Sequence, residues 1–223
     1  MQNPAKVRGI FSAIAARYDL ANHLLSGGLD FFWRARAVRI VSSWHPHRVL
    51  DLATGSGDLA LALKKSLPDA HVIGADFCLP MLKIAARKGV QSLVAADGTR
   101  LPFADNAFDA VTVAFGLRNM ESWPGALREM RRVLGPGGHL LVLDFSMPRP
   151  PLAAPYRFYL HRILPLAAGI ITGNRAGYVY LGESIESFPS GESMQTLVSD
   201  CGFRDPRCIP LAAGVVSIYT AQK

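Results

Sequence analysis

An apolar run that passes through a glycine-rich turn into a helix constrains the fold of this chain most. It reads Val49-Leu-Asp-Leu-Ala-Thr-Gly-Ser-Gly-Asp-Leu-Ala60. Gly55 and Gly57 lack Cβ atoms, so a ligand can approach the backbone there. The helix that follows directs unpaired N–H groups and a partial positive charge at the turn. This unit is typical of a site for a nucleotide-like cofactor, and by itself it leaves the cofactor open.

Strand-like and helix-like segments alternate along most of the remaining chain. Strands are predicted at 48–52, 71–75, 92–96, 110–114, 139–143, 207–211 and 215–221, and helices at 58–66, 80–88, 124–134 and 193–201. Gly135-Pro-Gly-Gly138 reads as a turn, and Ala212-Ala-Gly214 is short enough to join the last two strands as an antiparallel hairpin. The pattern predicts an α/β fold of the Rossmann-like class. We expect a mostly parallel seven-stranded sheet, with an antiparallel last strand and helices on both faces.

Size and composition indicate one domain. The chain has 223 residues, is 50% hydrophobic and can bury a full core. We expect residues 1–46 to form an N-terminal helical arm and 146–190 a helical insertion or lid. Three cysteines without metal-site spacing indicate thiols in a reducing cytosol and no metal. No apolar stretch reaches the roughly 20 residues of a membrane span. We therefore expect a cytoplasmic protein, whose only membrane contact would be peripheral, at the inner face.

Three aspartates follow three successive predicted strands. They are Asp51, Asp76 and Asp97. In a parallel sheet they lie along one edge, where ligands of such folds bind. Asp76 could accept both hydroxyls of a ribose, Asp97 an amino proton of adenine, and Asp51 could attract a cationic group. Any one of them alone is better explained as a helix cap or turn former, whereas three in succession favour a ligand.

The same loop also fits a dinucleotide fingerprint. Gly55-Ser-Gly-Asp-Leu-Ala60 has the required small residues, and Asp76 falls near the position of the ribose-binding acid, which leaves an NAD enzyme open. Asp51 at the entrance and Asp58 further along add negative charge, which disfavours a pyrophosphate. A cofactor with a sulfonium and an ammonium group suits this edge better.

Segments from nearly the whole chain resemble the quinone-biosynthesis C-methyltransferases, a family of class I methyltransferases that use S-adenosylmethionine. Tyr18-Asp19 with Asn22 and Phe115-Gly-Leu-Arg-Asn119 are the specific matches, whereas Leu134-Gly-Pro-Gly-Gly138 is common to many methyltransferases. The resemblance implies methylation of the ring of demethylmenaquinol or of a polyprenyl methoxy-benzoquinol. Two positions depart from the pattern: Ala53 replaces the first glycine of the general motif, and Ala114 stands where the family often has serine.

The resemblance also assigns residues to the cofactor. By resemblance, Ser56 contacts S-adenosylmethionine, Asp76 binds its ribose, and Asp97 and Gly98 lie beside its adenine. Together with the residues taken from the loop itself, the expected cofactor-binding set is Asp51, Gly55, Ser56, Gly57, Asp76, Asp97 and Gly98.

The expected catalytic residues are Arg118, Asn119 and Tyr18. Arg118 and Asn119 follow the predicted strand 110–114 and are assigned to orient the quinol oxygen and stabilise negative charge on it. Tyr18 would close over the cofactor from the N-terminal arm. A structural ion pair is the alternative for Arg118, and a core position is the alternative for Tyr18. His161 and His23 are candidate bases only because imidazole titrates near neutrality.

The formal charge of +7 leaves several partners open. Residues 146–182 hold four arginines, interleaved aromatics and no acidic residue, so they suit a membrane surface and a prenylated substrate. An ordinary lid or a homodimer interface is the alternative use. No nucleic-acid module is recognisable, which disfavours a nucleic-acid methyltransferase. A non-catalytic S-adenosylmethionine-binding subunit and an NAD oxidoreductase are the other rival functions.

Overall fold

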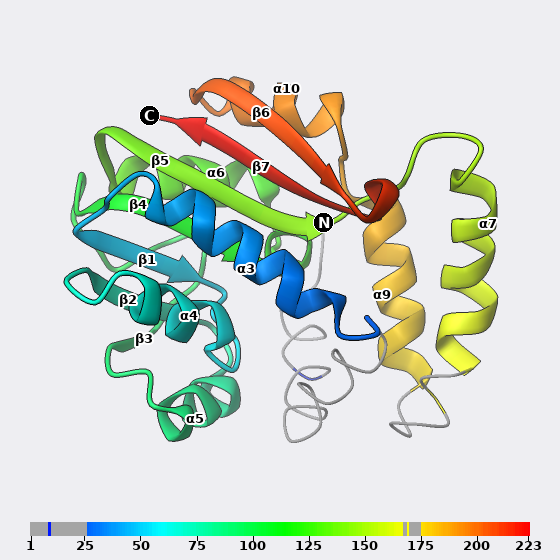
Figure 1. The fold of residues 1–223 in the computed structure, drawn as a ribbon, viewed down its shortest axis with the longest axis horizontal. Coiled ribbons are helices and arrows are strands. Elements are labelled where there is room, and N and C mark those ends of the chain that lie inside the picture. The colour runs from blue at the N-terminus through cyan, green and yellow to red at the C-terminus, as the bar shows by residue number, and fades with distance from the viewer. Residues whose placement is uncertain (1–8, 10–25, 167–168, 170–174) are drawn as a thin grey trace.

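A single sheet forms the centre of the molecule. The computed structural model describes residues 9, 26–166, 169 and 175–223. Within them a seven-stranded sheet has the order β3-β2-β1-β4-β5-β7-β6 (Figure 1). The strands are β1 (Arg48–Leu52), β2 (His71–Asp76), β3 (Leu93–Ala95), β4 (Phe108–Ala114), β5 (Leu134–Phe145), β6 (Arg204–Leu211) and β7 (Val216–Gln222). β1 to β5 pair in parallel, and β7 runs antiparallel to both β5 and β6. The predicted fold class is confirmed.

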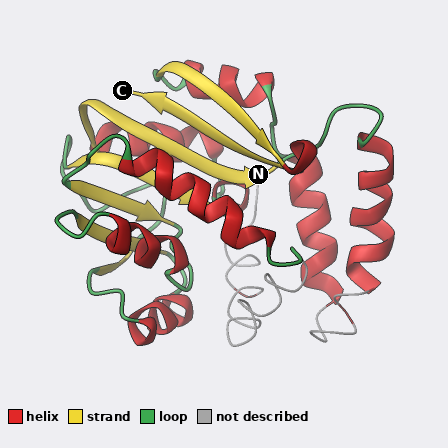
Figure 2. Cartoon of the chain, in the orientation of Figure 1, coloured by secondary structure: helices red, strands yellow, loops and turns green. Residues whose placement is uncertain are grey.

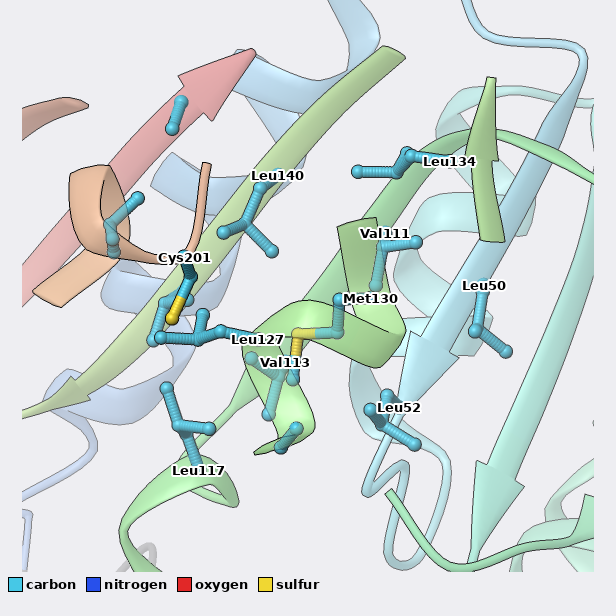
Figure 3. Close-up of a cluster of buried hydrophobic side chains, with 14 of the residues drawn as sticks. Leu50, Leu52, Val111, Val113, Leu117, Leu127, Met130, Leu134, Leu140 and Cys201 are labelled. Atoms are coloured by element: carbon cyan, nitrogen blue, oxygen red, sulfur yellow. The ribbon is translucent and has the colours of Figure 1, made fainter. Parts of the chain in front are cut away.

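Helices cover both faces of the sheet, as Figure 2 shows. They include α3 (Leu29–Ser42), α4 (Asp58–Ser66) and α5 (Leu79–Lys88), and, packed on the other side, α6 (Trp123–Val133) and α10 (Glu192–Asp200). Successive strand residues point to opposite faces. Val49 accordingly packs with Trp33 of α3 and Leu63 of α4. Leu50 packs with Met130 of α6 in the cluster drawn in Figure 3.

The predicted turn at Gly135–Gly138 was wrong, because these residues lie inside β5. Leu134 pairs with Phe108 and His139 with Ala110, so β5 bulges out against β4 between these two pairs. Gly137 adopts φ +74° in the bulge, a conformation that favours glycine. The local sequence resembles a turn, whereas pairing with a distant strand makes it part of the sheet.

Part of the molecule stands beside the sheet rather than on it. α7 (Ala153–Phe158), its continuation as the π-helical turn η3 (Tyr159–Ile163), and α9 (Arg175–Ser187) lie side by side in Figure 1. Leu160, Tyr178 and Ile185 bury their side chains between η3 and α9. This layer falls within the expected insertion 146–190. In the described ranges, no helix is both long and apolar enough to cross a bilayer.

Candidate active site

The glycine-rich loop after β1 is tied to the end of β2 by Asp76. One carboxylate oxygen of Asp76 accepts a hydrogen bond from the backbone N–H of Gly55 at 2.8 Å, and the other accepts from Cys78 N–H at 2.8 Å. Burial raises the pKa of Asp76, and the backbone donors Cys78, Gly55 and Phe77 oppose that rise. Asp76 therefore sets the position of the loop as well as lining the space beside it.

Beyond the ends of β1 to β4 lies a hollow of about 350 Å³, which we call the acidic hollow. Its walls include three carboxylate residues, Asp76, Asp97 and Glu121, and no lysine or arginine among the described residues. A smaller hollow of about 50 Å³, lined in part by Gly55, shares Ala53, Asp76, Phe77, Gly116 and Asn119 with it. This charge favours a cationic ligand and disfavours a pyrophosphate.

Asp97 and Gly98 both line the acidic hollow. The local structure also accounts for the residue type at each of these two positions. Asp97 Oδ1 accepts hydrogen bonds from the backbone N–H of Thr99 at 2.8 Å and from its hydroxyl at 2.7 Å. This is the turn-forming use of aspartate. A Cβ at Gly98 would lie 2.8 Å from the sulfur of Met120. The turn thus presents the exposed Asp97 side chain to the hollow.

Gly57 meets a packing requirement within the protein. A Cβ there would lie 2.6 Å from Val90 Cγ2, and its φ of +87° favours glycine. Neither Gly57 nor the buried Ser56 is among the residues that line these hollows. Asp58, which follows them, forms an ion pair with Lys88 at 2.6 Å, so its charge is largely balanced.

Asp51 lies behind the loop and does not line either hollow. Its two carboxylate oxygens accept hydrogen bonds from the hydroxyls of Thr54 at 2.6 Å and Thr112 at 2.8 Å. Burial raises the pKa of Asp51 to about 6, against the opposing effect of the two threonines. At neutral pH it is therefore mostly ionised and adds negative charge close to the acidic hollow.

Ala53 and Gly116 touch where the loop after β1 meets the turn after β4. Ala53 adopts φ +53°, a left-handed conformation that costs a non-glycine residue about 1–2 kcal/mol. A Cβ built on Gly116 would lie only 2.4 Å from the Ala53 Cβ. The alanine that departs from the general glycine pattern is thus accommodated by a glycine on the facing turn, and both residues line the acidic hollow.

This contact leads to a prediction about coupled substitutions. Gly116→Ala should lower the free energy of unfolding by about 1–3 kcal/mol, because it overpacks the contact with Ala53. Adding Ala53→Gly should recover most of that loss, since it removes the clashing methyl group and the left-handed alanine. Urea unfolding of both single variants and the double variant measures the coupling. Additive effects of the two substitutions would contradict a direct clash.

A further space of comparable size opens on the other side of the 115–119 turn. This aromatic cavity has a volume of about 290 Å³. Its walls come from the start of α3, the ends of β4 and β5, the α7–α9 layer and the tip of the β6–β7 hairpin. They include Trp33, Phe115, Arg118, Asn119, Phe145, Tyr156, Tyr159, Tyr178 and Tyr180. Asn119 borders the aromatic cavity, the acidic hollow and the smaller hollow alike, so the spaces meet at this side chain.

The backbone carbonyl of Phe115 organises the turn between these spaces. Phe115 adopts φ +57°, and backbone strain of this kind is concentrated at functional sites. Its oxygen accepts hydrogen bonds from Arg118 Nη1 at 2.5 Å and from Asn119 Nδ2 at 3.3 Å. The two predicted catalytic side chains are therefore brought together by one carbonyl.

Arg118 is held by a buried carboxylate that sequence reasoning missed. Arg118 Nη1 lies 2.6 Å from Asp144 Oδ1, and Asp144 is completely buried. Burial raises the pKa of Asp144, and the Arg118 charge and hydrogen bonds oppose it. The guanidinium also lies 5.3 Å from the centre of the Phe145 ring, and its buried Nε has no hydrogen-bond partner in the described structure. The ion pair considered as the alternative for Arg118 is present, and Arg118 also lines the aromatic cavity, where the predicted catalytic role would place it.

The remaining residues that the sequence suggested as catalytic groups or bases are Tyr18, His23 and His161. Tyr18 and His23 lie outside the described residues. His161 Nε2 lies 2.8 Å from an oxygen of Glu186 on the surface, and it does not line the aromatic cavity. Tyr156, Tyr159 and Tyr180 were not proposed from the sequence; their signal was the density of aromatic residues in the segment 146–182.

Solved structures share this fold. A SAM-dependent methyltransferase from Thermotoga maritima matches with a TM-score of 0.69 and 18% sequence identity, covering 96% of this chain and 99% of that one. A SAM-dependent methyltransferase from Aquifex aeolicus matches with a TM-score of 0.60 over 82% of this chain and 87% of its own. The fold is therefore that of the SAM-dependent methyltransferases of class I.

The amino-acid sequence places the chain more narrowly. It belongs to the ubiE/COQ5 methyltransferase family, whose model matches residues 1–223. A demethylmenaquinone methyltransferase of Thermus thermophilus is 49% identical, with 96% of this chain and 100% of the relative covered. A ubiquinone/menaquinone biosynthesis C-methyltransferase of Syntrophotalea carbinolica is 42% identical, with 96% of this chain and 92% of the relative covered. The family resemblance seen in the sequence is confirmed.

Proposed function

We propose that this chain transfers the methyl group of S-adenosylmethionine to a ring carbon of a reduced prenylated quinone, with demethylmenaquinol as its acceptor. The observation that carries the proposal is the meeting of the acidic hollow and the aromatic cavity at Asn119. The names of the family relatives support the choice of acceptor. Because one of them includes ubiquinone, methylation of the benzoquinol ring is the second candidate.

The acidic hollow suits the cofactor. When bound, S-adenosylmethionine supplies an electrophilic methyl group on a sulfonium ion. Asp76 would accept hydrogen bonds from the ribose hydroxyls, and Asp97 with Gly98 would lie beside the adenine. Gly55 would present its backbone at close range, and the buried Asp51 would attract positive charge through the loop. The carboxylates that line the hollow, together with the absence of a described lysine or arginine there, support this assignment over a dinucleotide.

The aromatic cavity suits a planar apolar ring. Its tyrosine, phenylalanine and tryptophan side chains bury such a ring, and Arg118 supplies a fixed positive charge at the wall. A quinol becomes nucleophilic at carbon as its hydroxyl loses a proton, so a cation next to the oxygen would stabilise the charge that develops. Asp144 holds Arg118 in place before the acceptor arrives, so little reorganisation is needed during the reaction.

Three of the tyrosines that line the aromatic cavity are poor candidates for a base. Burial raises the pKa of Tyr156, Tyr159 and Tyr180 above the usual range of a phenol. All three therefore keep their protons at neutral pH and act as hydrogen-bonding groups. Arg118 would promote loss of the acceptor's proton by stabilising the phenolate, and the proton would pass to solvent.

Peripheral membrane contact is a further part of the proposal. Phe32, Phe158 and Leu166 are exposed, and each lies within two positions in the sequence of a residue that lines the aromatic cavity: Trp33, Tyr159 and Leu164. Exposed apolar side chains in the elements that form the cavity, with Arg162 close by in sequence, suit a bilayer that holds a prenyl tail. Flotation with anionic vesicles tests this, and equal binding by Phe32→Ser/Phe158→Ser and the unaltered chain would contradict it.

Methyl transfer itself is tested with labelled S-adenosylmethionine and each reduced acceptor under anaerobic conditions. We expect label in the ring of demethylmenaquinol and none when the oxidised quinone is supplied without reductant. Label only in the methoxy-benzoquinol would favour the second candidate. Label in neither ring would contradict the proposed activity, including for a chain that binds the cofactor.

A further inference from the structure

The hydroxyl of Tyr180 meets the side chain of Asn119 at the wall of the aromatic cavity. Tyr180 belongs to α9, which stands beside the tip of the β6–β7 hairpin in Figure 1, and Asn119 belongs to the turn after β4. Both residues line the cavity, and the Tyr180 hydroxyl lies 3.1 Å from Asn119 Oδ1. The contact joins the helical layer to the point where the cavity and the acidic hollow meet.

The orientation of Asn119 decides which group donates in this hydrogen bond. Its Nδ2 lies 3.3 Å from the Phe115 carbonyl oxygen, which can only accept. The amide nitrogen must therefore face Phe115, and Oδ1 faces Tyr180. Because Oδ1 can also only accept, Tyr180 donates its single hydroxyl proton to Asn119. The hydroxyl can then offer only its lone pairs to a molecule in the cavity.

A quinol and a quinone differ at the atoms that such a wall contacts. The ring hydroxyls of a quinol can donate a hydrogen bond, whereas the carbonyl oxygens of a quinone can only accept one. An oxygen that offers only lone pairs can accept a hydrogen bond from the quinol hydroxyl, whereas it can form none with the quinone carbonyl. Arg118 makes the opposite kind of contact, because a guanidinium only donates and can bind an oxygen of either form.

We propose that Tyr180, held in place by Asn119, selects the reduced form of the acceptor over the oxidised form. The selection rests on the proposed function, which it deepens by naming the residue that distinguishes the two oxidation states. Selecting the reduced form keeps the unreactive form out of the cavity, since the oxidised ring is electrophilic and cannot accept a methyl cation. A quinone bound in the cavity would only inhibit.

Binding measurements test the selection without relying on turnover. Anaerobic equilibrium dialysis, with S-adenosylhomocysteine present, gives the Kd of 2-prenyl-1,4-naphthoquinol and of the corresponding quinone. Tyr180→Phe should raise the Kd of the quinol about three- to tenfold, the worth of one hydrogen bond, and change that of the quinone less than about twofold. Asn119→Leu should instead lower the Kd of the quinone by about the same factor, because the freed hydroxyl can donate to a carbonyl.

Tyr219→Phe is the matched control. Tyr219 is also buried, and its hydroxyl accepts a hydrogen bond from Gly191 N–H at 2.9 Å, away from the cavity. This variant should keep the ratio of the two Kd values. If Tyr180→Phe weakens both forms equally, or if Asn119→Leu leaves quinone binding unchanged, the selection is wrong.

These measurements distinguish a failure of the proposed selection from a failure of the proposed methyl transfer. A wild-type chain that prefers the quinol but methylates no acceptor contradicts the proposed function and retains the selection. A wild-type chain that methylates the quinol but binds both forms equally contradicts the selection alone.

Discussion

Asp144→Ala should lower the free energy of unfolding by about 3–5 kcal/mol, because it leaves the buried guanidinium of Arg118 without its counter-charge. Arg118→Ala should cost a similar amount, since the uncompensated charge is then the completely buried carboxylate of Asp144. Urea unfolding measures both. Asp105→Ala is the control, because Asp105 pairs with Arg132 at 2.7 Å but is largely exposed, and exposed pairs contribute only about 0–1 kcal/mol.

A double substitution separates the structural role of Arg118 from its proposed catalytic role. Arg118→Met/Asp144→Leu replaces the ion pair with apolar residues of similar size, and such replacements are often neutral or stabilising. We expect most of the lost stability to return. Methyl transfer should stay at least about 100-fold below that of the unaltered chain, because the donor to the acceptor oxygen is gone. Recovery of turnover together with stability would show that Arg118 only supports the fold.

Asp76→Ala should weaken the binding of S-adenosylmethionine about 100-fold or more. The reason is that two hydrogen bonds from ribose hydroxyls to a charged group are lost, each worth about 1.5–3 kcal/mol. Calorimetric titration measures the affinity. Asp69→Ala removes an exposed aspartate before β2 and should leave the affinity for S-adenosylmethionine unchanged.

The stability of the Asp76 variants must be measured together with their affinity for S-adenosylmethionine, because Asp76 also has a structural role. Its carboxylate also accepts hydrogen bonds from Gly55 and Cys78, so thermal unfolding has to show that each variant is folded at the titration temperature. Asp76→Asn retains an acceptor oxygen and should bind the cofactor with intermediate affinity. An affinity equal to that of the unaltered chain in both variants would exclude the ribose role.

The features that the sequence predicted well are those set by short-range pattern. The first strand was predicted to end at Leu52, as β1 does, and the second at residue 75, one residue before β2 ends at Asp76. These ends, and the edge of the sheet at which the following loops lie, follow from apolar runs and the parallel topology. The structural requirement for glycine at position 57 could not be predicted from the local pattern. Its need for a missing Cβ arises from Val90, which packs against it only in the folded chain.

The other features that the sequence did not predict depend on contacts between residues far apart in the chain. Asp144 lies at the end of an apolar strand, where it resembles any other strand-terminal aspartate, and only the fold brings it to Arg118. Tyr180 is one of several aromatic residues in the segment 146–182, and its hydrogen bond to Asn119 depends on how α9 packs against the turn after β4. The bulge in β5 likewise depends on pairing with Phe108.

The two spaces draw on different stretches of the chain. The walls of the acidic hollow come from residues 52–121, whereas much of the aromatic cavity comes from residues 156–185. Only the turn that contains Asn119 belongs to both. Exchanging residues 146–190 for those of a relative would therefore change walls of the proposed acceptor cavity and leave every wall of the acidic hollow in place.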